Sequence, residues 1–239
     1  MFIKERVFMG SKIDLLKRIP IFSSLSDDHA VELASIAVEK SYKKNQVIFD
    51  QGDPGNSLII LRSGLVKISL VDSNDHEFII KTLAENDFFG EMSLLDGGRR
   101  SASAIAVEDT RVLIIYREDF VRLIKKNPNV ALHMLTVLTH RLRMTTDNIS
   151  NLTFFDAYGK VARCLLDLSD KIGVKGDEGI VLDVKLSRQE LANMAGLTRE
   201  TFARILKEFQ IRGCLKTQGK KIIILSKKIL ANEIKMNIG

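Results

Sequence analysis

Between residues 41 and 117 the chain is a series of short hydrophobic runs separated by turn residues. Some runs alternate apolar and polar side chains, as at 66–70, where Val66, Ile68 and Leu70 flank Lys67 and Ser69. That alternation is typical of a half-buried strand, and evenly spaced runs with Gly, Asp and Pro between them predict an antiparallel sandwich or roll. We expect strands at 46–49, 58–61, 66–71, 78–83, 102–107 and 112–116.

The pattern becomes helical after Pro128 and stays so for about 25 residues. Apolar positions follow each other at spacings of three and four, the seam of a two-stranded coiled coil, and this favours a parallel homodimer. The seam residues are Leu135, Leu138, Leu142, Ile149 and Leu152. Thr145 is a polar seam position, which either fixes the register or faces something polar at the dimer axis. An amphipathic helix packed against its own domain is the alternative.

Composition excludes several classes of protein. The 239 residues are 45% hydrophobic, enough for a globular core, and no apolar run approaches the roughly 18 residues of a membrane-spanning helix. Residues 1–11 lack the apolar centre of a signal peptide, so we expect a cytoplasmic protein. Cys164 and Cys214 have no metal-ligand spacing and are expected to be small buried residues.

The excess of positive over negative charge lies entirely in the last third of the chain. Residues 1–154 contain 20 basic and 20 acidic side chains, whereas residues 155–239 contain 16 basic and 10 acidic ones, a net charge of +6. This asymmetry suggests that the C-terminal part faces a nucleic acid. The same part is predicted to be rich in helices, with β-hairpins at 175–179 and 214–225.

The loop around Gly90 contains the residue types that bind a small phosphate. Glycine lets the backbone approach a ligand, and residues 91–95 can form a short helical turn whose N–H groups attract an anion. Arg100 can pair with a phosphate, and Ser101 adds a hydroxyl. A phosphate would repel Glu91, which we expect to accept hydrogen bonds from a neutral group such as a sugar hydroxyl. An ion pair between Glu91 and Arg100 is the alternative.

A second motif lies at 187–210. Ser187 and Glu190 form the capping box of one helix, the turn at 195–197 contains Gly196, and Thr198 caps a second helix. The second helix has an apolar face (Phe202, Ile205, Leu206, Phe209) and a polar face (Arg199, Glu200, Ala203, Arg204, Lys207). Because arginine reads guanine and glutamate accepts from cytosine, this predicts a helix-turn-helix that reads DNA. A solvated charged face is the alternative.

The loop around Gly90 and the residues after it resemble the cyclic-nucleotide-binding domain family. Its phosphate-binding cassette is a Phe-Gly-Glu turn, a short helix and Arg-Ser-Ala, found here at 89–102. The resemblance implies that Glu91 holds the ribose 2′-hydroxyl and that Arg100, rather than its neighbour Arg99, holds the cyclic phosphate. The implied ligand residues are Ile68, Leu83, Gly90, Glu91, Met92, Ser93, Arg100, Ser101, Thr145 and Thr146.

Residues 12–225 as a whole resemble the CRP/FNR family of transcription regulators. The family's reading set, Arg-Glu-Thr-x-x-Arg, is present at 199–204 and implies a TGTGA-like half-site repeated as a palindrome. The implied DNA-binding residues are Arg188, Thr198, Arg199, Glu200, Thr201, Arg204 and Lys220. Of these, Arg188, Thr198, Thr201 and Lys220 match positions that touch phosphates, which orient the protein without reading sequence.

Three further assignments follow from the resemblance. Thr145 and Thr146 align with the adjacent Thr and Ser that contact adenine from the two subunits, which favours cyclic AMP. Both residues are threonine here, and cyclic GMP is the alternative. Asp156 matches the hinge and is expected to cap the next helix, and the loop Gly173–Gly179 resembles the surface that touches RNA polymerase. Residues 1–40 contain no cysteine, which argues against an iron–sulfur cluster, and no histidine or cysteine suits a haem.

The sequence therefore predicts an α+β protein with three parts. They are a cyclic-nucleotide-binding domain at 1–127, built as a double-stranded antiparallel β-roll, a dimerisation helix and hinge at 128–154, and a winged helix-turn-helix at 155–239. We expect a homodimeric, non-enzymatic transcription regulator that binds duplex DNA under control of a cyclic purine nucleotide, with no resident cofactor or metal. The open alternatives are the same fold sensing another small molecule, constitutive DNA binding, and a cyclic-nucleotide-binding regulatory subunit of an enzyme.

Overall fold

A computed structural model describes the backbone of residues 2–235 and the side chains of residues 10–146 and 155–234. The chain divides into two compact units, residues 1–70 with 81–143, and residues 71–80 with 144–239. We keep 1–127, 128–154 and 155–239 as the proposed division by function.

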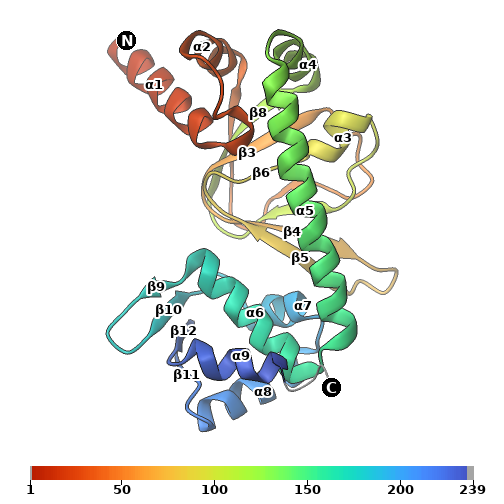
Figure 1. The fold of residues 1–239 in the computed structure, drawn as a ribbon, viewed down its shortest axis with the longest axis vertical. Coiled ribbons are helices and arrows are strands. Elements are labelled where there is room, and N and C mark those ends of the chain that lie inside the picture. Colours follow the sequence, from red (N-terminus) through yellow and green to blue (C-terminus); the bar gives the residue numbers. More distant parts are fainter. Residues whose placement is uncertain (1, 236–239) are drawn as a thin grey trace. The chain divides into compact units, whose positions relative to one another are not determined.

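The N-terminal part is a pair of four-stranded sheets with helices before and after them (Figure 1). Its strands are β1 (Val38–Tyr42), β2 (Val47–Phe49), β3 (Ser57–Ser63), β4 (Val66–Val71), β5 (Glu77–Leu83), β6 (Phe88–Phe89), β7 (Ser103–Ala106) and β8 (Thr110–Tyr116). The sheet orders are β1-β8-β3-β6 and β2-β7-β4-β5, which confirms the predicted antiparallel β-roll. The sequence pattern had identified neither β1 nor the two-residue β6.

The first sheet is buried on both faces. On β3, Ile59 and Leu61 face the opposite sheet, while Leu58 and Ile60 belong to a second core that includes residues of the helices. Those helices are α1 (Phe2–Arg18), the 3-10 turn η1 (Pro20–Phe22), α2 (Asp27–Ile36) and α4 (Arg117–Lys126). This double burial explains why residues 58–61 are continuously apolar instead of alternating.

Helix α1 begins at Phe2. Its C-terminal half is anchored by buried leucines and by Lys12, whose ammonium donates to the carbonyl of Ala37 at 2.7 Å, just beyond α2. A lysine so deeply buried is tolerated because its charge meets backbone acceptors at a helix C-terminus.

Helix α5 (Pro128–Phe154) confirms the predicted long helix, with proline at its first position. The C-terminal part then contains α6 (Ala157–Ile172), β9 (Val174–Lys175), β10 (Ile180–Asp183), α7 (Arg188–Ala195), α8 (Arg199–Ile211), β11 (Leu215–Gln218), β12 (Lys221–Ile224) and α9 (Lys227–Lys235). Its sheet has the order β11-β12-β10-β9, and the hairpin β11–β12 is the wing. The sequence analysis had not identified α9, whose Leu230 is fully buried.

Candidate functional site

The cassette begins with a backbone turn that only glycine adopts easily. Gly90 has φ +80° and is followed at once by α3 (Glu91–Asp96), the predicted short helix. A Cβ atom at this position would collide with the guanidinium of Arg100 and lie 2.9 Å from the carbonyl oxygen of Ser57. Glycine therefore lets the arginine pass under the turn.

Arg100 is only 6% exposed, and all its hydrogen-bond partners are neutral. Its Nη1 donates to the carbonyls of Ser57 (3.1 Å) and Gly90 (3.0 Å) and to the Ser93 hydroxyl (2.9 Å), and its Nη2 donates to the Ser57 hydroxyl (2.9 Å). The guanidinium lies 4.2 Å from the ring centre of Phe49, and its Nε has no hydrogen-bond partner. Burial lowers the pKa of Arg100, against the charges of nearby carboxylates, so a buried cation here is suited to an anion.

Glu91 does not pair with Arg100, and the alternative of an ion pair between them is wrong. Glu91 is 7% exposed and instead accepts from Nη1 of Arg141, on α5, at 2.7 Å. Arg141 also donates through Nη2 to the carbonyl of Phe88 at 2.6 Å and lies 4.1 Å above the ring of that residue. Arg141 was not predicted as a site residue, although it lies close to Thr145 on the same helix.

The other predicted ligand residues have mixed exposure. Ser93 is buried and bonded to Arg100, whereas Met92 is 52% exposed. The hydroxyl of Ser101 contacts the sulfur of Met92 at 3.4 Å. Ile68 and Leu83 are buried in the core of the roll. Thr145 and Thr146 lie on the part of α5 that belongs to the second compact unit, and both are exposed.

The predicted dimer seam is only partly exposed on α5. Leu135 and Leu142 are 61% and 68% exposed, and Leu132 beside them is 60% exposed. Leu138 instead packs against the core of the N-terminal part. The side chains of Ile149 and Leu152 lie outside the described residues.

The helix-turn-helix has the predicted caps. The Ser187 hydroxyl accepts from the backbone N–H of Glu190 at 3.2 Å, and the Glu190 carboxylate accepts from the N–H of Ser187 at 2.8 Å. Gly196 ends α7 with φ +64°, and the Thr198 hydroxyl accepts from the N–H of Thr201 at 3.2 Å. These local bonds fix where α7 ends and α8 begins.

The two faces of α8 are as predicted. Its buried side chains are Phe202, Ile205, Leu206 and Phe209. Its exposed residues include Arg199, Glu200, Ala203, Arg204 and Lys207, and Thr201 is half-buried between the faces. Lys220 is exposed in the turn of the wing. Arg188 is half-buried, with an unpartnered Nη1 and a pKa lowered by burial.

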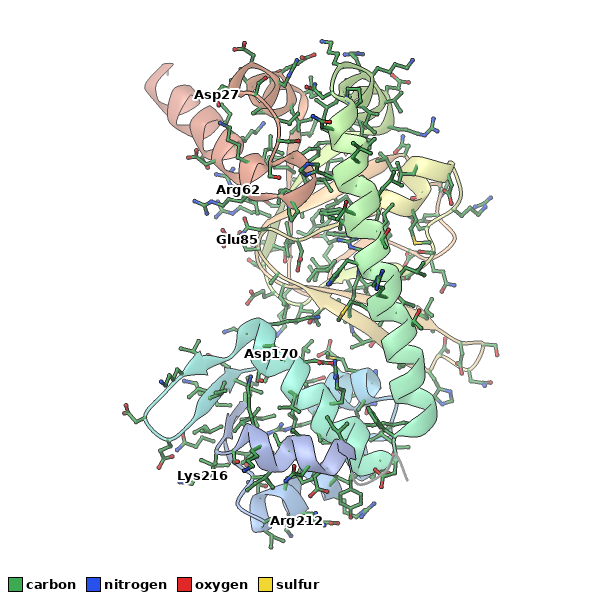
Figure 2. All side chains as sticks on the ribbon, in the orientation of Figure 1. Asp27, Arg62, Glu85, Asp170, Arg212 and Lys216 are labelled. Atoms are coloured by element: carbon green, nitrogen blue, oxygen red, sulfur yellow. The ribbon has the colours of Figure 1, made fainter. Side chains whose placement is uncertain are left out.

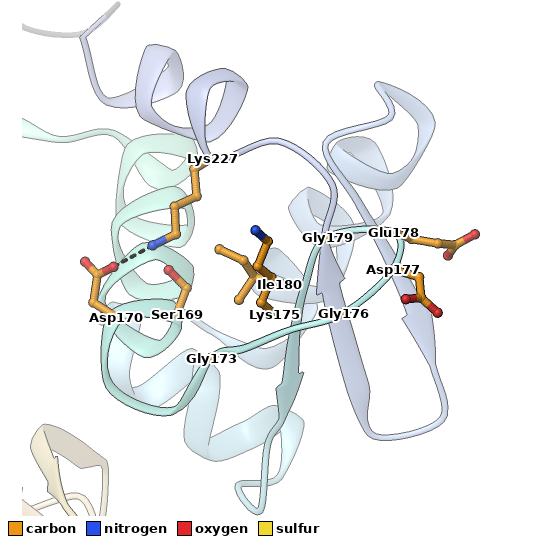
Figure 3. A pocket seen from close by; sticks show the side chains of 10 residues that line it. All are labelled: Ser169, Asp170, Gly173, Lys175, Gly176, Asp177, Glu178, Gly179, Ile180 and Lys227. Carbon is orange, nitrogen blue, oxygen red and sulfur yellow. Dashed lines mark hydrogen bonds and ion pairs between the residues drawn. The ribbon is translucent and has the colours of Figure 1, made fainter.

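Asp156, the expected hinge residue, caps α6 as predicted. The Asp156 carboxylate accepts from the N–H of Gly159 at 2.9 Å, at the start of α6. At the other end of α6, the loop Gly173–Gly179 lines a cavity of about 590 Å³ in which Lys227 donates to Asp170 at 2.5 Å (Figure 3).

A smaller cavity of about 320 Å³ lies in the N-terminal part, lined by Arg18, Arg62 and Arg111 together with Asp14 and Glu85. Arg62, labelled in Figure 2, pairs with Glu39 at 2.9 Å.

Cys164 and Cys214 are both buried, as expected, and burial raises the pKa of Cys164 to about 12. Within the described residues, no three histidine, cysteine or acidic side chains gather as a metal site. In that same part of the chain, no helix combines the length and the apolar character needed to cross a membrane.

Comparison with known proteins agrees with both the cassette and the helix-turn-helix. Residues 39–127 match the cyclic nucleotide-binding domain family, and residues 159–233 match the Crp-like helix-turn-helix domain. A CRP-like cAMP-activated global transcriptional regulator of Mycobacterium tuberculosis is 30% identical over 91% of this chain and 97% of its own. The chain belongs to the CRP/FNR family.

Two further proteins are similar to this chain over most of its length. The cyclic AMP receptor protein of Thermus thermophilus is 33% identical over 94% of this chain and 100% of its own length. The solved structure of the c-di-GMP responsive global regulator CLP of Xanthomonas campestris has a TM-score of 0.74 at 27% identity, over 84% of this chain and 100% of that one.

The chain is thus a CRP-family DNA-binding transcription regulator with a cyclic nucleotide-binding domain. The family is not enzymatic, which confirms that prediction. The predicted helix-turn-helix and β-roll are confirmed as well.

Proposed function

We propose that this regulator is switched by a cyclic purine nucleotide, with cyclic AMP favoured. The observation that carries the proposal is Arg100, a buried guanidinium with neutral partners only and an unpartnered Nε beneath the Gly90 turn. A cyclic phosphate would supply the negative charge that none of the partners of Arg100 carries. The relatives from Mycobacterium tuberculosis and Thermus thermophilus are both named for cyclic AMP.

Glu91 is the proposed acceptor for the ribose hydroxyl. Its carboxylate already accepts a hydrogen bond from Arg141. A ribose hydroxyl that binds Glu91 therefore either donates to the same carboxylate beside the arginine or displaces the arginine. Because Arg141 lies on α5, the ligand changes a contact of the helix that we propose forms the dimer seam. A ligand shifts a conformational equilibrium only through such differential contacts.

The protein works as a homodimer in this proposal. Leu132, Leu135 and Leu142 expose large apolar side chains at spacings of three and seven along α5, the repeat of a coiled-coil seam. Leu142→Glu should convert the dimer to a monomer in size-exclusion chromatography with light scattering, while Val121→Glu on α4 should not. A dimer that survives Leu142→Glu would rule this seam out.

On DNA, the two copies of α8 enter successive major grooves about 34 Å apart. Arg199, Glu200 and Arg204 read a TGTGA-like half-site, while Arg188, Thr198, Thr201 and Lys220 contact phosphates. RNA polymerase is the further proposed partner, through the loop Gly173–Gly179, and the cytoplasm is the proposed location. Val174 in that loop is 68% exposed, which suits a contact surface.

The test is a fluorescence-anisotropy titration on duplex TGTGA-N6-TCACA at fixed salt, with cyclic AMP, cyclic GMP or no ligand. Tight binding only with cyclic AMP is the expected result. Equal binding in all three conditions would rule out control by a cyclic nucleotide and indicate a constitutive DNA-binding protein.

A second candidate is the same fold switched by another ligand. The Glu91–Arg141 ion pair favours it, because it occupies the carboxylate that a ribose needs, and the similar Xanthomonas campestris regulator responds to c-di-GMP. Adding c-di-GMP as a fourth arm of the titration separates the two candidates.

A further inference from the structure

Three side chains from two helices form one hydrogen-bonded network in the C-terminal part. Tyr158, at the second position of α6, donates its hydroxyl proton to Oε2 of Glu208 on α8 at 2.5 Å. Arg204, one turn earlier on α8, donates from Nη1 to Oε1 of Glu208 at 3.0 Å and to the Tyr158 hydroxyl at 3.4 Å. The carboxylate is thus bonded on both oxygens.

The direction of the Tyr158 hydroxyl is fixed by what surrounds the ring. The buried Phe209 meets the ring edge to face at 6.2 Å, and the guanidinium of Arg212, labelled in Figure 2, lies 5.5 Å from the ring centre. The backbone of α6 is itself fixed two residues earlier by the Asp156 cap. Tyr158 is therefore a rigid support for a carboxylate on another helix.

The network leaves one edge of Arg204 available. Its hydrogen bonds within the described residues all use Nη1, whereas bidentate recognition of guanine needs only two of the five N–H donors. The side chain of Arg204 is still 59% exposed, so it is held without being covered. This geometry holds Arg204 through Nη1 and leaves the rest of its guanidinium exposed to solvent.

An isolated surface pair four residues apart on a helix would do little, because solvent and side-chain entropy weaken it. Here the hydrogen bond from Tyr158 is the largest cause that lowers the pKa of Glu208, ahead of the charge of Arg204. The tyrosine hydroxyl therefore stabilises the ionised form of the carboxylate that pairs with Arg204. Freezing a free arginine on binding costs affinity, and a preorganised arginine avoids part of that cost.

We propose that Tyr158 and Glu208 are positioning residues that hold Arg204 ready for a guanine and so set discrimination at the base pair it reads. This inference rests on the proposed base-reading role of Arg204. Glu208 and Tyr158 themselves touch no base in this scheme. They act through the conformation of one side chain.

The experiment uses the full-length protein with cyclic AMP and the duplex that it selects from a random library. Each G·C pair of the selected half-site is replaced by A·T, and the ratio of Kd values for replaced and selected duplexes is measured at fixed salt. Arg204→Ala should bring the Kd ratio close to 1 at one base pair and so identify the pair that this residue reads. Tyr158→Phe, which keeps the ring and removes only the hydroxyl, should lower that ratio about fivefold.

Glu208→Gln should act in the same direction, since it keeps an acceptor for Tyr158 and removes the charge that holds Arg204. Tyr116→Phe, at the end of β8, is the matched control and should leave every ratio unchanged. Binding to a scrambled duplex should stay the same in Tyr158→Phe and Tyr116→Phe, which change no charge, and thermal unfolding verifies that each variant is folded.

The outcomes separate the inference from the proposed function. If Tyr158→Phe weakens binding to all duplexes equally, or acts as strongly in the Arg204→Ala background, positioning is wrong and the tyrosine is merely structural. An unchanged ratio in Tyr158→Phe would also overturn it. If Arg204→Ala alters no ratio, or no sequence is selected at all, it is the proposed DNA reading by Arg204 that fails, and the positioning role fails with it.

Discussion

Arg100 in the cassette and Arg199 on α8 have opposite surroundings. Arg100 is almost fully buried, and it is bonded to two backbone carbonyls and two serine hydroxyls. Arg199 is the first residue of α8 and is exposed. The fold holds Arg100 in the absence of a ligand, whereas we propose that Arg199 is held mainly by the DNA that it reads.

This difference determines how each arginine responds to change. Salt screens exposed charges beyond roughly 10 Å at 0.1 M and affects buried ones much less. Binding at Arg100 should therefore depend little on salt, whereas binding at the DNA face should depend on it steeply. It also means that substitutions at Arg100 test ligand binding and folding together, but substitutions at Arg199 test DNA binding alone.

Arg100→Ala is the largest expected effect. Removing one partner of a buried charged contact costs about 2–5 kcal/mol, so affinity for cyclic AMP should fall by a factor of about 30 or more in isothermal titration calorimetry. The hydroxyls of Ser57 and Ser93 lose their donor as well, and the melting temperature should drop.

Arg99→Ala is the matched control, since Arg99 is exposed and its side chain bonds the carbonyl of Gly52. It should bind cyclic AMP almost as the parent does. Equal losses in the two variants would show that the buried arginine has no special role toward the ligand.

Arg199→Ala should come next in size. Loss of a base-reading arginine costs about 1–3 kcal/mol on the selected duplex and much less on a scrambled one. Cyclic AMP affinity should not change, because Arg199 and the cassette belong to different compact units. Anisotropy on both duplexes gives the comparison, and an equal loss on the two would remove Arg199 from the reading set.

The helix-turn-helix was largely predictable from sequence because its signals are local. Ser187 and Glu190 cap one helix within three residues, and the spacing of Phe202, Ile205 and Phe209 defines the buried face of the next. Each of these features depends on neighbours less than two helical turns away. The structure confirmed the capping box, the Thr198 cap and both faces of α8.

The cassette was predictable in composition but not in its pairing. Glu91 and Arg100 are close in sequence, yet Glu91 bonds Arg141, which is 50 residues away. The sheet orders that bring these segments together join strands distant in the chain, such as β1 with β8. No local pattern specifies such pairings, and for the same reason the short strand β6 was missed.

Ser187→Ala tests the local part of the comparison. Losing a helix N-cap costs about 1 kcal/mol, so the C-terminal part should unfold at lower denaturant concentration while ligand binding by the cassette stays intact. Glu190→Gln is the control, because glutamine also completes a capping box. Chemical unfolding followed by circular dichroism measures both variants. Equal stability of Ser187→Ala and the parent would mean that the cap contributes nothing to this unit.

Lys220→Ala should have the smallest effect and sharpens the contrast between charge and sequence reading. An exposed lysine on the wing that touches a phosphate releases about one counterion, so its loss should lower the slope of log Kd against log salt by about 1. The loss should be the same on selected and scrambled duplexes, unlike that of Arg199→Ala. Lys228→Ala, an exposed lysine on α9, should leave the slope unchanged. A loss confined to the selected duplex would instead place Lys220 among the residues that read bases, and the wing would then contribute to sequence recognition.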